Sequence, residues 1–276
     1  MWLVHLTLGL AALYAAIVSV MYFAQTWLLF PTALARAAWV QLPASAQHLK
    51  LGTPDGQNLV GMRIPSSGGG TKRAPTLLGF GGNAWNAGTM ASMLRTLLPE
   101  RDIVAFHYRG YAPSGGRPSA KALLSDSLVI FDDLRKAQAN QPIVVIGFSI
   151  GSGVAAYLAR HRPVAGLILV TPFDSLEALA RDLYWWAPVK QLFRHRMPTI
   201  EFVQGSPAPT ALIIAERDAV VPARRSAPLR LAIRDLVFEC AIDAGHNNIY
   251  DHPDFAAAIR EALARIEARA SEALEG

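Results

Sequence analysis

The strongest candidate for chemistry in this chain is the run GFSIG, residues 147–151, which holds Ser149 between two glycines. It follows the apolar run IVVI and precedes VAAYLA, so it stands between a predicted strand and a predicted helix. This pattern is typical of a nucleophile elbow, a sharp turn that raises a serine hydroxyl above a sheet. The flanking glycines leave room for such a strained turn. We therefore predict that Ser149 is a nucleophile.

The same stretch offers a second interpretation, because residues 151–156, GSGVAA, fit the GxGxxA pattern of a dinucleotide-binding loop. Such a loop begins directly where its strand ends, so that the helix N-terminus meets the pyrophosphate. Here the predicted strand, 142–146, ends well before Gly151, and the glycines would fall inside the helix. Asp174 stands at nearly the spacing of a ribose-binding acid, but nothing else downstream fits. We therefore favour the elbow.

A serine hydroxyl is a weak nucleophile until a base accepts its proton, so the hypothesis requires an acid and a histidine. After a strand-turn-helix serine, the expected chain order is Asp or Glu and then His. The segments ERDAVVP and IDAGHNNIYDHP each follow an apolar run typical of a strand. They place Asp218 and His246 in loops at the sheet edge that carries Ser149. We predict that Asp218 is the acid and His246 the base.

Neighbouring groups remain as alternatives to these partners. Glu216 and Asp243 are acids close to the predicted ones, and each is either a surface charge or a backup acid. His252 directly precedes the last predicted helix and is expected to cap it. His107 ends a strand and His161 ends a helix, so we expect both to be structural.

Attack by a serine also requires backbone amides that stabilise the developing oxyanion. Ile150 supplies one amide, because it begins the helix that follows Ser149. The second is expected in the loop after the third strand, which reads GFGGNAWN. Gly81 and Gly82 let this backbone approach a substrate closely, which leaves the Asn83 amide as the predicted donor. A plain glycine turn is the alternative.

The elements that must position these residues alternate between short apolar runs and helical patterns, which is typical of a mostly parallel sheet with helices on both faces. The link GTPDGQN predicts an antiparallel hairpin of the first two strands. Strands are predicted at 48–51, 59–64, 75–80, 102–107, 142–146, 166–171, 210–215 and 236–241, and helices at about 85–98, 120–138, 150–161 and 254–273.

The alternation stops between residues 174 and 208, in a segment that contains LYWWAPVKQLFRHRMP. It is too short for a cap domain but has room for one or two helices over the C-terminal edge of the sheet, where sites lie in such folds. We therefore predict a short lid. Trp185 and Trp186 stand beside basic residues and suit a membrane surface, although internal aromatic packing under a solvated basic rim is the expectation we favour.

Residues 1–35 contain no Asp, Glu, Lys or Arg, and the run 6–30 is long enough to cross ~30 Å of hydrocarbon as a helix. We predict a transmembrane anchor over 1–32 and a catalytic domain over 33–276. A cleaved signal peptide and a buried core helix are the alternatives, but a basic n-region is missing and the run is long for a signal. Arg36 and Lys50 follow the span, which favours a cytoplasmic catalytic domain at a bacterial inner membrane.

Composition argues against several other classes. The single cysteine, Cys240, permits no internal disulfide, and its apolar surroundings predict a buried structural thiol. We expect neither a metal nor nucleic acid, because no Cys/His cluster has zinc spacing and no basic block is present. The net charge of +5 is spread along the chain and suits a solvated surface or an anionic membrane face.

These motifs resemble the α/β-hydrolase superfamily, and within it the membrane-anchored, small-lid serine hydrolases related to the abhydrolase-domain proteins that include protein depalmitoylases. The resemblance runs through LLFP, GGNA, YRGYAPSGGRPS, GFSIGSGVA, VTPFDSL, ERDAVVP and GHNNIY in the order of the family. It implies the α/β-hydrolase fold, with these roles: Ser149 as nucleophile, Asp218 as acid, His246 as base, and the amides of Asn83 and Ile150 as the oxyanion hole.

One departure concerns the oxyanion loop, where many relatives have His-Gly-Asn and this chain has Gly81-Gly82-Asn83. Substrates of the histidine-containing relatives therefore do not transfer. We predict hydrolysis of a carboxylic ester or thioester, with a small-molecule or lipid-like acyl group, through an acyl-enzyme and without a cofactor. A serine peptidase of the same fold and an inactive, membrane-tethered binding or scaffold protein are the alternatives.

Overall fold

One sheet of eight strands forms the centre of the protein, whose computed structural model describes residues 1–37, 40–67, 74–138 and 141–275. The strands lie in the order β1-β2-β4-β3-β5-β6-β7-β8. β2 is antiparallel to both β1 and β4, and every other neighbouring pair is parallel. The predicted α/β fold with a mostly parallel sheet is confirmed, as is the antiparallel hairpin.

Every predicted strand is present with its ends within two residues of the predicted ones. The strands are β1 (Gln47–Gly52), β2 (Asn58–Ile64), β3 (Thr76–Phe80), β4 (Ile103–Phe106), β5 (Ile143–Phe148), β6 (Gly166–Val170), β7 (Thr210–Ala215) and β8 (Leu236–Ile242). β3 to β6 are buried at every position, which explains why their sequences are continuous apolar runs without alternation.

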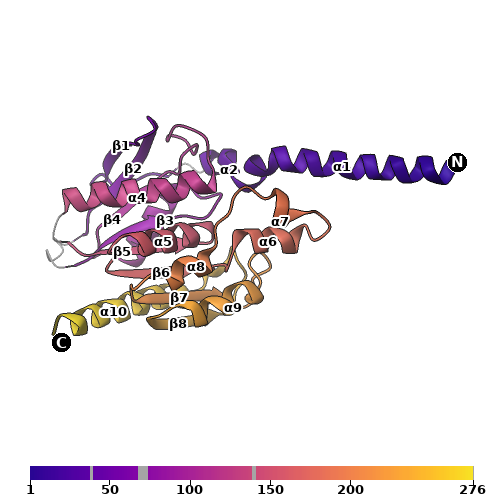
Figure 1. Cartoon of the computed structure of the whole chain (residues 1–276). Coiled ribbons are helices and arrows are strands. Elements are labelled where there is room, and N and C mark those ends of the chain that lie inside the picture. Colours follow the sequence, from indigo (N-terminus) through magenta and orange to yellow (C-terminus); the bar gives the residue numbers. More distant parts are fainter. Residues whose placement is uncertain (38–39, 68–73, 139–140, 276) are drawn as a thin grey trace.

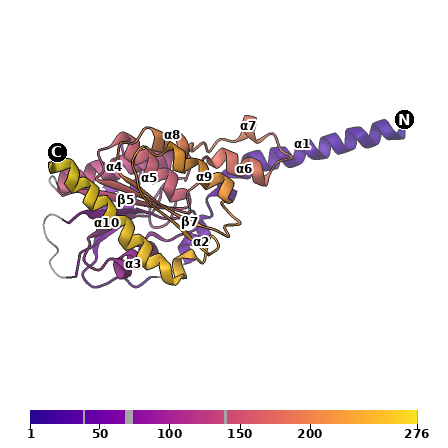
Figure 2. The ribbon, with the colours of Figure 1, turned by 90° about the horizontal axis from the view of Figure 1, so that it is seen from below.

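Helices cover both faces of this sheet (Figures 1 and 2). One face carries α4 (Ala120–Ala137), α5 (Ile150–His161), α8 (Thr199–Gln204) and α9 (Ala223–Ala232), and the other carries α3 (Ala87–Leu97) and α10 (Pro253–Glu275). The four predicted helices are confirmed. The predicted apolar stripe of α10, residues Phe255, Ile259, Leu263 and Ile266, is buried against the sheet.

Other helices depart from the prediction. The segment between β6 and β7 forms three short helices, α6 (Leu176–Leu183), α7 (Val189–Leu192) and α8, and the last packs on α5 and not over the sheet edge. α9 was missed because its sequence, ARRSAPLRLA, contains Pro228 and buries only three side chains, so it lacks an apolar stripe. α2 (Thr32–Ala37) and the 3₁₀ turn η1 (Ile249–Asp251) are too short to show a period.

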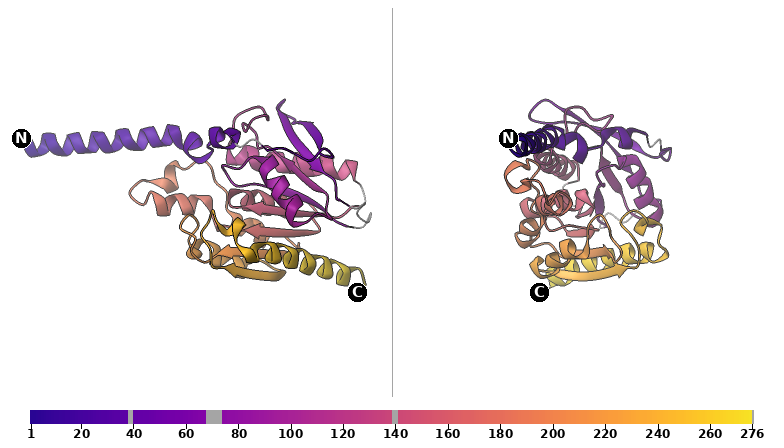
Figure 3. Two further views of the ribbon diagram at one scale, coloured as in Figure 1. Left: turned by 180° about the vertical axis from the view of Figure 1, so that it is seen from behind. Right: turned by 90° about the vertical axis from the view of Figure 1, so that its right-hand side faces the viewer.

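α1 (Trp2–Leu29) projects from the body of the protein (Figures 1 and 3). Among the described residues it begins the only helix that is long and apolar enough to cross a membrane, and other elements bury none of its most apolar stretch. A core helix of a soluble protein would be covered by other elements. The buried-helix alternative is therefore wrong.

Candidate active site

The turn at Ser149 joins β5 directly to α5, because β5 ends at Phe148 and α5 begins at Ile150. Ser149 has φ 50° and ψ −118°, a backbone conformation that residues with a side chain rarely adopt. Its amide donates to the carbonyl of Val170 in β6, which holds the turn in this conformation. The strained backbone therefore lies at the predicted nucleophile, as is common at functional sites.

The glycines on either side of Ser149 are required by space. A Cβ on Gly147 would lie 2.3 Å from the carbonyl oxygen of Gly151, and a Cβ on Gly151 would lie 2.1 Å from that of Phe80. Gly153 lies inside α5, as predicted, but a Cβ there would meet Met197 Sδ at 2.3 Å. Met197, and not the sheet, therefore fills the space beside Gly153. With Gly151 and Gly153 inside the helix, they shape no dinucleotide loop.

The loops after β7 and β8 bring Asp218 and His246 to Ser149. The Oγ atom of Ser149 lies 3.0 Å from His246 Nε2, and His246 Nδ1 lies 2.7 Å from Asp218 Oδ2. A carboxylate only accepts hydrogen bonds, so Nδ1 carries the proton and Nε2 is free to accept from the serine. The other carboxylate oxygen of Asp218 accepts from the amides of Val220 and Val221 at 2.8 and 2.6 Å, which fixes the acid.

The alternative partners have other contacts. Glu216 is exposed at the end of β7, and Asp243 is exposed in an ion pair with Arg217 at 2.6 Å. His252 Nδ1 accepts from the Asp254 amide at the start of α10, as expected of a cap.

Two further histidines have contacts or burial that suit a structural role. His161 bonds the Tyr157 carbonyl through Nδ1 within α5, at 2.8 Å. His107 is buried after β4, and burial lowers its pKa to about 4. Both agree with the structural roles expected of them.

The predicted oxyanion loop lies beside the serine, since Asn83 and Ile150 line the same cavity as Ser149. Ile150 is the first residue of α5, where a helix leaves its amide without an intrahelical partner. Two tyrosines hold the loop: Tyr108 donates to the Gly81 carbonyl at 2.8 Å and Tyr111 to the Asn83 carbonyl at 2.5 Å. Neither tyrosine was predicted, because each meets the loop across more than twenty residues of chain.

Trp85 fills the space beside Gly81 in the predicted oxyanion loop. A Cβ on Gly81 would lie 3.3 Å from Trp85 Cβ. The Trp85 ring packs against the rings of Phe148 and Tyr250, with centroid distances of 5.3 and 4.6 Å. Burial in this cluster raises the pKa of Tyr250 to about 12, so its hydroxyl stays neutral beside Asp218. The loop is thus supported by aromatic packing.

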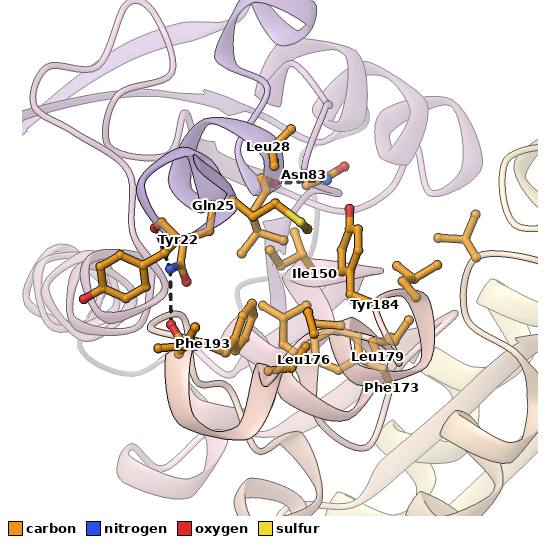
Figure 4. Close-up of a pocket in the computed structure, with 18 of the residues that line it drawn as sticks. Tyr22, Gln25, Leu28, Asn83, Ile150, Phe173, Leu176, Leu179, Tyr184 and Phe193 are labelled. Atoms are coloured by element: carbon orange, nitrogen blue, oxygen red, sulfur yellow. Dashed lines mark hydrogen bonds between the residues drawn. The ribbon is translucent and has the colours of Figure 1, made fainter. Parts of the chain in front are cut away.

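A cavity of about 300 Å³ lies next to Ser149, between α1 and the lid helices α6 and α7 (Figure 4). Its walls are mostly apolar. From α1 they include Val18, Met21, Tyr22, Gln25, Leu28 and Leu29, and from the lid segment they include Leu176, Leu179, Leu183, Tyr184, Leu192 and Phe193. Such a cavity suits an apolar chain whose reactive end meets the serine.

Polar contacts join α1 to the lid. Gln25 donates to the Leu192 carbonyl at 3.3 Å and accepts from the Arg194 amide at 2.8 Å. Thr26 Oγ1 lies 2.9 Å from Nε2 of the buried His195. Gln25 and Thr26 are two adjacent polar residues in a mostly apolar run, and that pair was the signal in the sequence that α1 contacts protein at this level.

Cys240 lies on β8 and is only half-buried, so the predicted buried thiol is wrong. The outer edge strand β8 leaves its side chains partly accessible, and the remaining burial raises the pKa of the thiol. Within the described ranges, no group of three or more His, Cys, Asp or Glu side chains is arranged to hold a metal ion.

Three features are typical of an α/β-hydrolase fold. They are the sheet order, the strained serine turn, and the contacts that join Ser149, His246 and Asp218. The chain belongs to the α/β-hydrolase superfamily, whose family model, the alpha/beta hydrolase fold, matches residues 76–199. That match runs from β3 into α8 and includes the serine turn.

Among characterised and uncharacterised relatives, a protein of Mycobacterium tuberculosis of unknown function is 34% identical over 188 residues, or 67% of this chain and 66% of that protein. The lysophosphatidylserine lipase ABHD12 of Macaca fascicularis is 26% identical over 198 residues, or 60% of this chain and 49% of the lipase. The chain thus spans about half to two thirds of the length of these relatives.

Solved structures show the same fold. The esterase Pf2001 of Pyrococcus furiosus aligns with a TM-score of 0.65 and 19% identity, over 83% of this chain and 96% of the esterase. A membrane phospholipase A aligns with a TM-score of 0.63 and 18% identity, over 95% of this chain and 99% of that protein. Together with the family, the esterase and lipase neighbours support hydrolase activity for this chain.

Proposed function

We propose that the protein is a serine hydrolase that cleaves ester or thioester bonds of substrates with an apolar acyl chain. The observation that carries this proposal is the connected series Ser149, His246 and Asp218, with contacts of 3.0 and 2.7 Å, beside a cavity with mostly apolar walls. The lysophosphatidylserine lipase among the relatives supports a lipid ester as the natural substrate class.

In the proposed reaction, His246 Nε2 accepts the proton of Ser149 as Oγ attacks the carbonyl carbon. The carbonyl oxygen becomes an oxyanion that accepts hydrogen bonds from the Ile150 and Asn83 amides. The positive end of the α5 dipole favours the same charge. Asp218 holds the imidazole and stabilises its protonated form.

Collapse of this intermediate breaks the bond to the leaving group. The leaving alcohol or thiol departs with the proton from His246, and Ser149 keeps the acyl group as an ester. Water then attacks the acyl-enzyme while His246 accepts a proton from it. Release of the carboxylic acid returns that proton to Ser149 and restores the enzyme.

We further propose that α1 stays in the mature protein as a single-pass anchor in a bacterial inner membrane. α1 is uncharged and unburied, which suits hydrocarbon. Its C-terminal half forms a wall of the cavity, so cleavage after Ala35 would remove Gln25, Thr26 and Leu29 from the site. A signal peptide does not need such contacts.

The test is a hydrolysis panel of p-nitrophenyl esters and acyl thioesters, from acetyl to palmitoyl, with the full-length enzyme in phospholipid vesicles. We expect hydrolysis to fall by about 10⁴-fold or more in Ser149→Ala, as in other enzymes that lose the triad serine. Ser125→Ala, an exposed serine on α4, is the control and should match the wild type. Activity that survives in Ser149→Ala would contradict the proposal.

A further inference from the structure

The cavity has a wall in α1, and this raises the question of the direction from which a substrate arrives. We propose that an acyl chain enters from the adjoining membrane leaflet, along α1 and through the seam between α1 and the lid. This inference rests on the proposed function and assigns to α1 a second role as part of the substrate site.

The first step concerns the depth of α1 in a bilayer. Its 28 residues extend ~42 Å at ~1.5 Å per residue, whereas the hydrocarbon core is ~30 Å thick and needs ~20 residues. If the hydrocarbon begins at Trp2, it ends near Met21, and if it ends at Leu29, it begins near Leu10. Tyr14 lies within the hydrocarbon in both limits.

The second step places the end of the lid beside Tyr14. The Tyr14 hydroxyl donates to the Trp186 carbonyl at 3.0 Å, and the two rings lie edge to face at 6.2 Å between centroids. In all views the lid helices α6 and α7 run alongside the base of α1 (Figures 1 to 3). Residues 183–186, the lid tip, therefore lie at a depth where α1 is surrounded by hydrocarbon.

The third step is the surface of the lid tip itself. Leu183 is 61% exposed and Trp185 is 80% exposed, so the internal aromatic packing expected from the sequence is wrong for Trp185. Large apolar side chains that project together from a protein mark an interaction surface. Next to a membrane-spanning helix, the partner that fits this surface is the acyl region of the leaflet.

The fourth step locates the membrane interface. The Arg194 guanidinium lies 4.7 Å from the centre of the Tyr22 ring and donates to the Tyr22 carbonyl at 3.2 Å. Arginine and tyrosine are residues that favour the level of the headgroups. This places the interface near Tyr22 and selects the limit in which the hydrocarbon ends near Met21.

The cavity connects the level of the hydrocarbon with the level of Ser149. Its α1 wall runs from Val18, within the hydrocarbon, to Leu29, whose carbonyl accepts from the Asn83 side chain beside the serine. This interval is ~16 Å along the helix, so the wall extends from the hydrocarbon below Met21 to the level of the serine. Leu28 and Leu183 line the cavity and are 48% and 61% exposed, so its rim is apolar. A chain keeps its orientation in the leaflet while its carbonyl moves to Ser149.

A substituted cavity wall tests this route. Val18→Trp fills the cavity from α1, whereas Val20→Trp places the same side chain on a position that is 67% exposed and does not line the cavity. Full-length enzymes are placed in phosphatidylcholine and phosphatidylglycerol vesicles. The readout is the ratio of the rate on p-nitrophenyl palmitate, which dissolves in the bilayer, to the rate on p-nitrophenyl butyrate, which is supplied from water.

We expect Val18→Trp to lower this ratio by about tenfold or more, because overfilling an apolar site costs ~1 to 3 kcal/mol, and Val20→Trp to leave it unchanged. Equal ratios in both variants would overturn the inference, because the long chain would then not run along the α1 wall of the cavity. Hydrolysis of butyrate by Val18→Trp shows that the enzyme is folded. If the wild type shows no hydrolysis that depends on Ser149, the proposed function itself is refuted.

The depth of the lid tip is tested by cysteine labelling in a Cys240→Ser background, which removes the only native thiol. W185C places a thiol on the lid tip, and L231C places one on α9, where the native side chain is 91% exposed. In intact vesicles we expect a maleimide to label L231C and to label W185C only after SDS is added. Equal labelling rates in intact vesicles would place the lid tip in water and overturn the inference.

Discussion

The two sides of Ser149 are built in different ways. On the catalytic side, Asp218 and His246 follow adjacent strands of the sheet and are each 9% exposed. On the substrate side, the cavity is closed by the helices α1, α6 and α7. These helices lie outside the sheet and leave large apolar side chains exposed. The difference teaches that the sheet positions the residues of the proposed chemistry, whereas the proposed selection of the substrate depends on elements whose apolar surfaces suit a membrane.

The largest effect is expected on the catalytic side, from loss of the acid. Asp218→Asn removes the acceptor that fixes the His246 tautomer, and we expect kcat/KM on p-nitrophenyl butyrate to fall by about 10⁴-fold. Asp243→Asn is the matched control, because this exposed acid pairs only with Arg217 among the described residues. An equal or larger loss in Asp243→Asn would reverse the assignment of the acid.

The turn at Ser149 should tolerate no added atom. Gly151→Ala would place a methyl group 2.1 Å from the Phe80 carbonyl oxygen, in backbone that cannot move without disrupting the oxyanion loop. We expect destabilisation of at least ~3 kcal/mol, measured by thermal unfolding in detergent, or loss of folded protein. Gly115→Ala has its nearest neighbour at 3.7 Å and should unfold like the wild type. Similar stability of the two variants would mean that the backbone around Ser149 can adapt to an added methyl group.

Acid should lower the stability of the folded protein through His107, which follows β4 on the side of the sheet. Burial lowers its folded pKa from 6.5 to about 4, so the unfolded chain binds a proton that the folded one does not. Stability is then full above pH 6.5 and decreases as the pH falls towards 4, by up to about 3 kcal/mol. Thermal unfolding from pH 7 to pH 4.5 measures this slope. His107→Asn should have a flatter profile, and an unchanged slope would exclude His107 as its source.

The smallest effect is expected on the substrate side, where a few hydrogen bonds join α1 to the lid. Gln25→Leu keeps the size of the side chain but leaves the Leu192 carbonyl and the Arg194 amide without their partner, a loss of ~1 to 3 kcal/mol. We expect trypsin to cut the lid segment roughly 5 to 150 times faster, while the rest of the domain stays resistant. The control is Gln191→Leu, an exposed position on α7 whose side chain forms no hydrogen bond within the described part of the chain. Equal cleavage of both variants would mean that Gln25 does not hold the lid.

The same comparison explains what could be predicted from the sequence. Ser149, Asp218 and His246 each follow a strand with a clear apolar pattern, and the carboxyl ends of parallel strands meet at one edge. Their convergence therefore followed from local patterns and chain order. The glycines at 147 and 151 were predicted for the same reason, since the turn itself demands them.

The substrate side could not be predicted in this way. Thr26 meets His195, and Tyr14 meets Trp186, across more than 160 residues of chain, and no periodicity links these segments. α1 was predicted as an anchor because its composition suits hydrocarbon, but composition does not tell which face of a helix lines a cavity. The same limit applies to Gly153, whose neighbour Met197 lies in an irregular segment.

The most direct test of the account is to label the full-length enzyme in vesicles with a fluorophosphonate and to locate the adduct by mass spectrometry. We predict a single adduct, on Ser149, that is absent in Ser149→Ala, much reduced in His246→Ala and unchanged in Ser125→Ala. Labelling that persists in Ser149→Ala, or an adduct on another residue of the wild type, would contradict the assignment of Ser149 as the nucleophile.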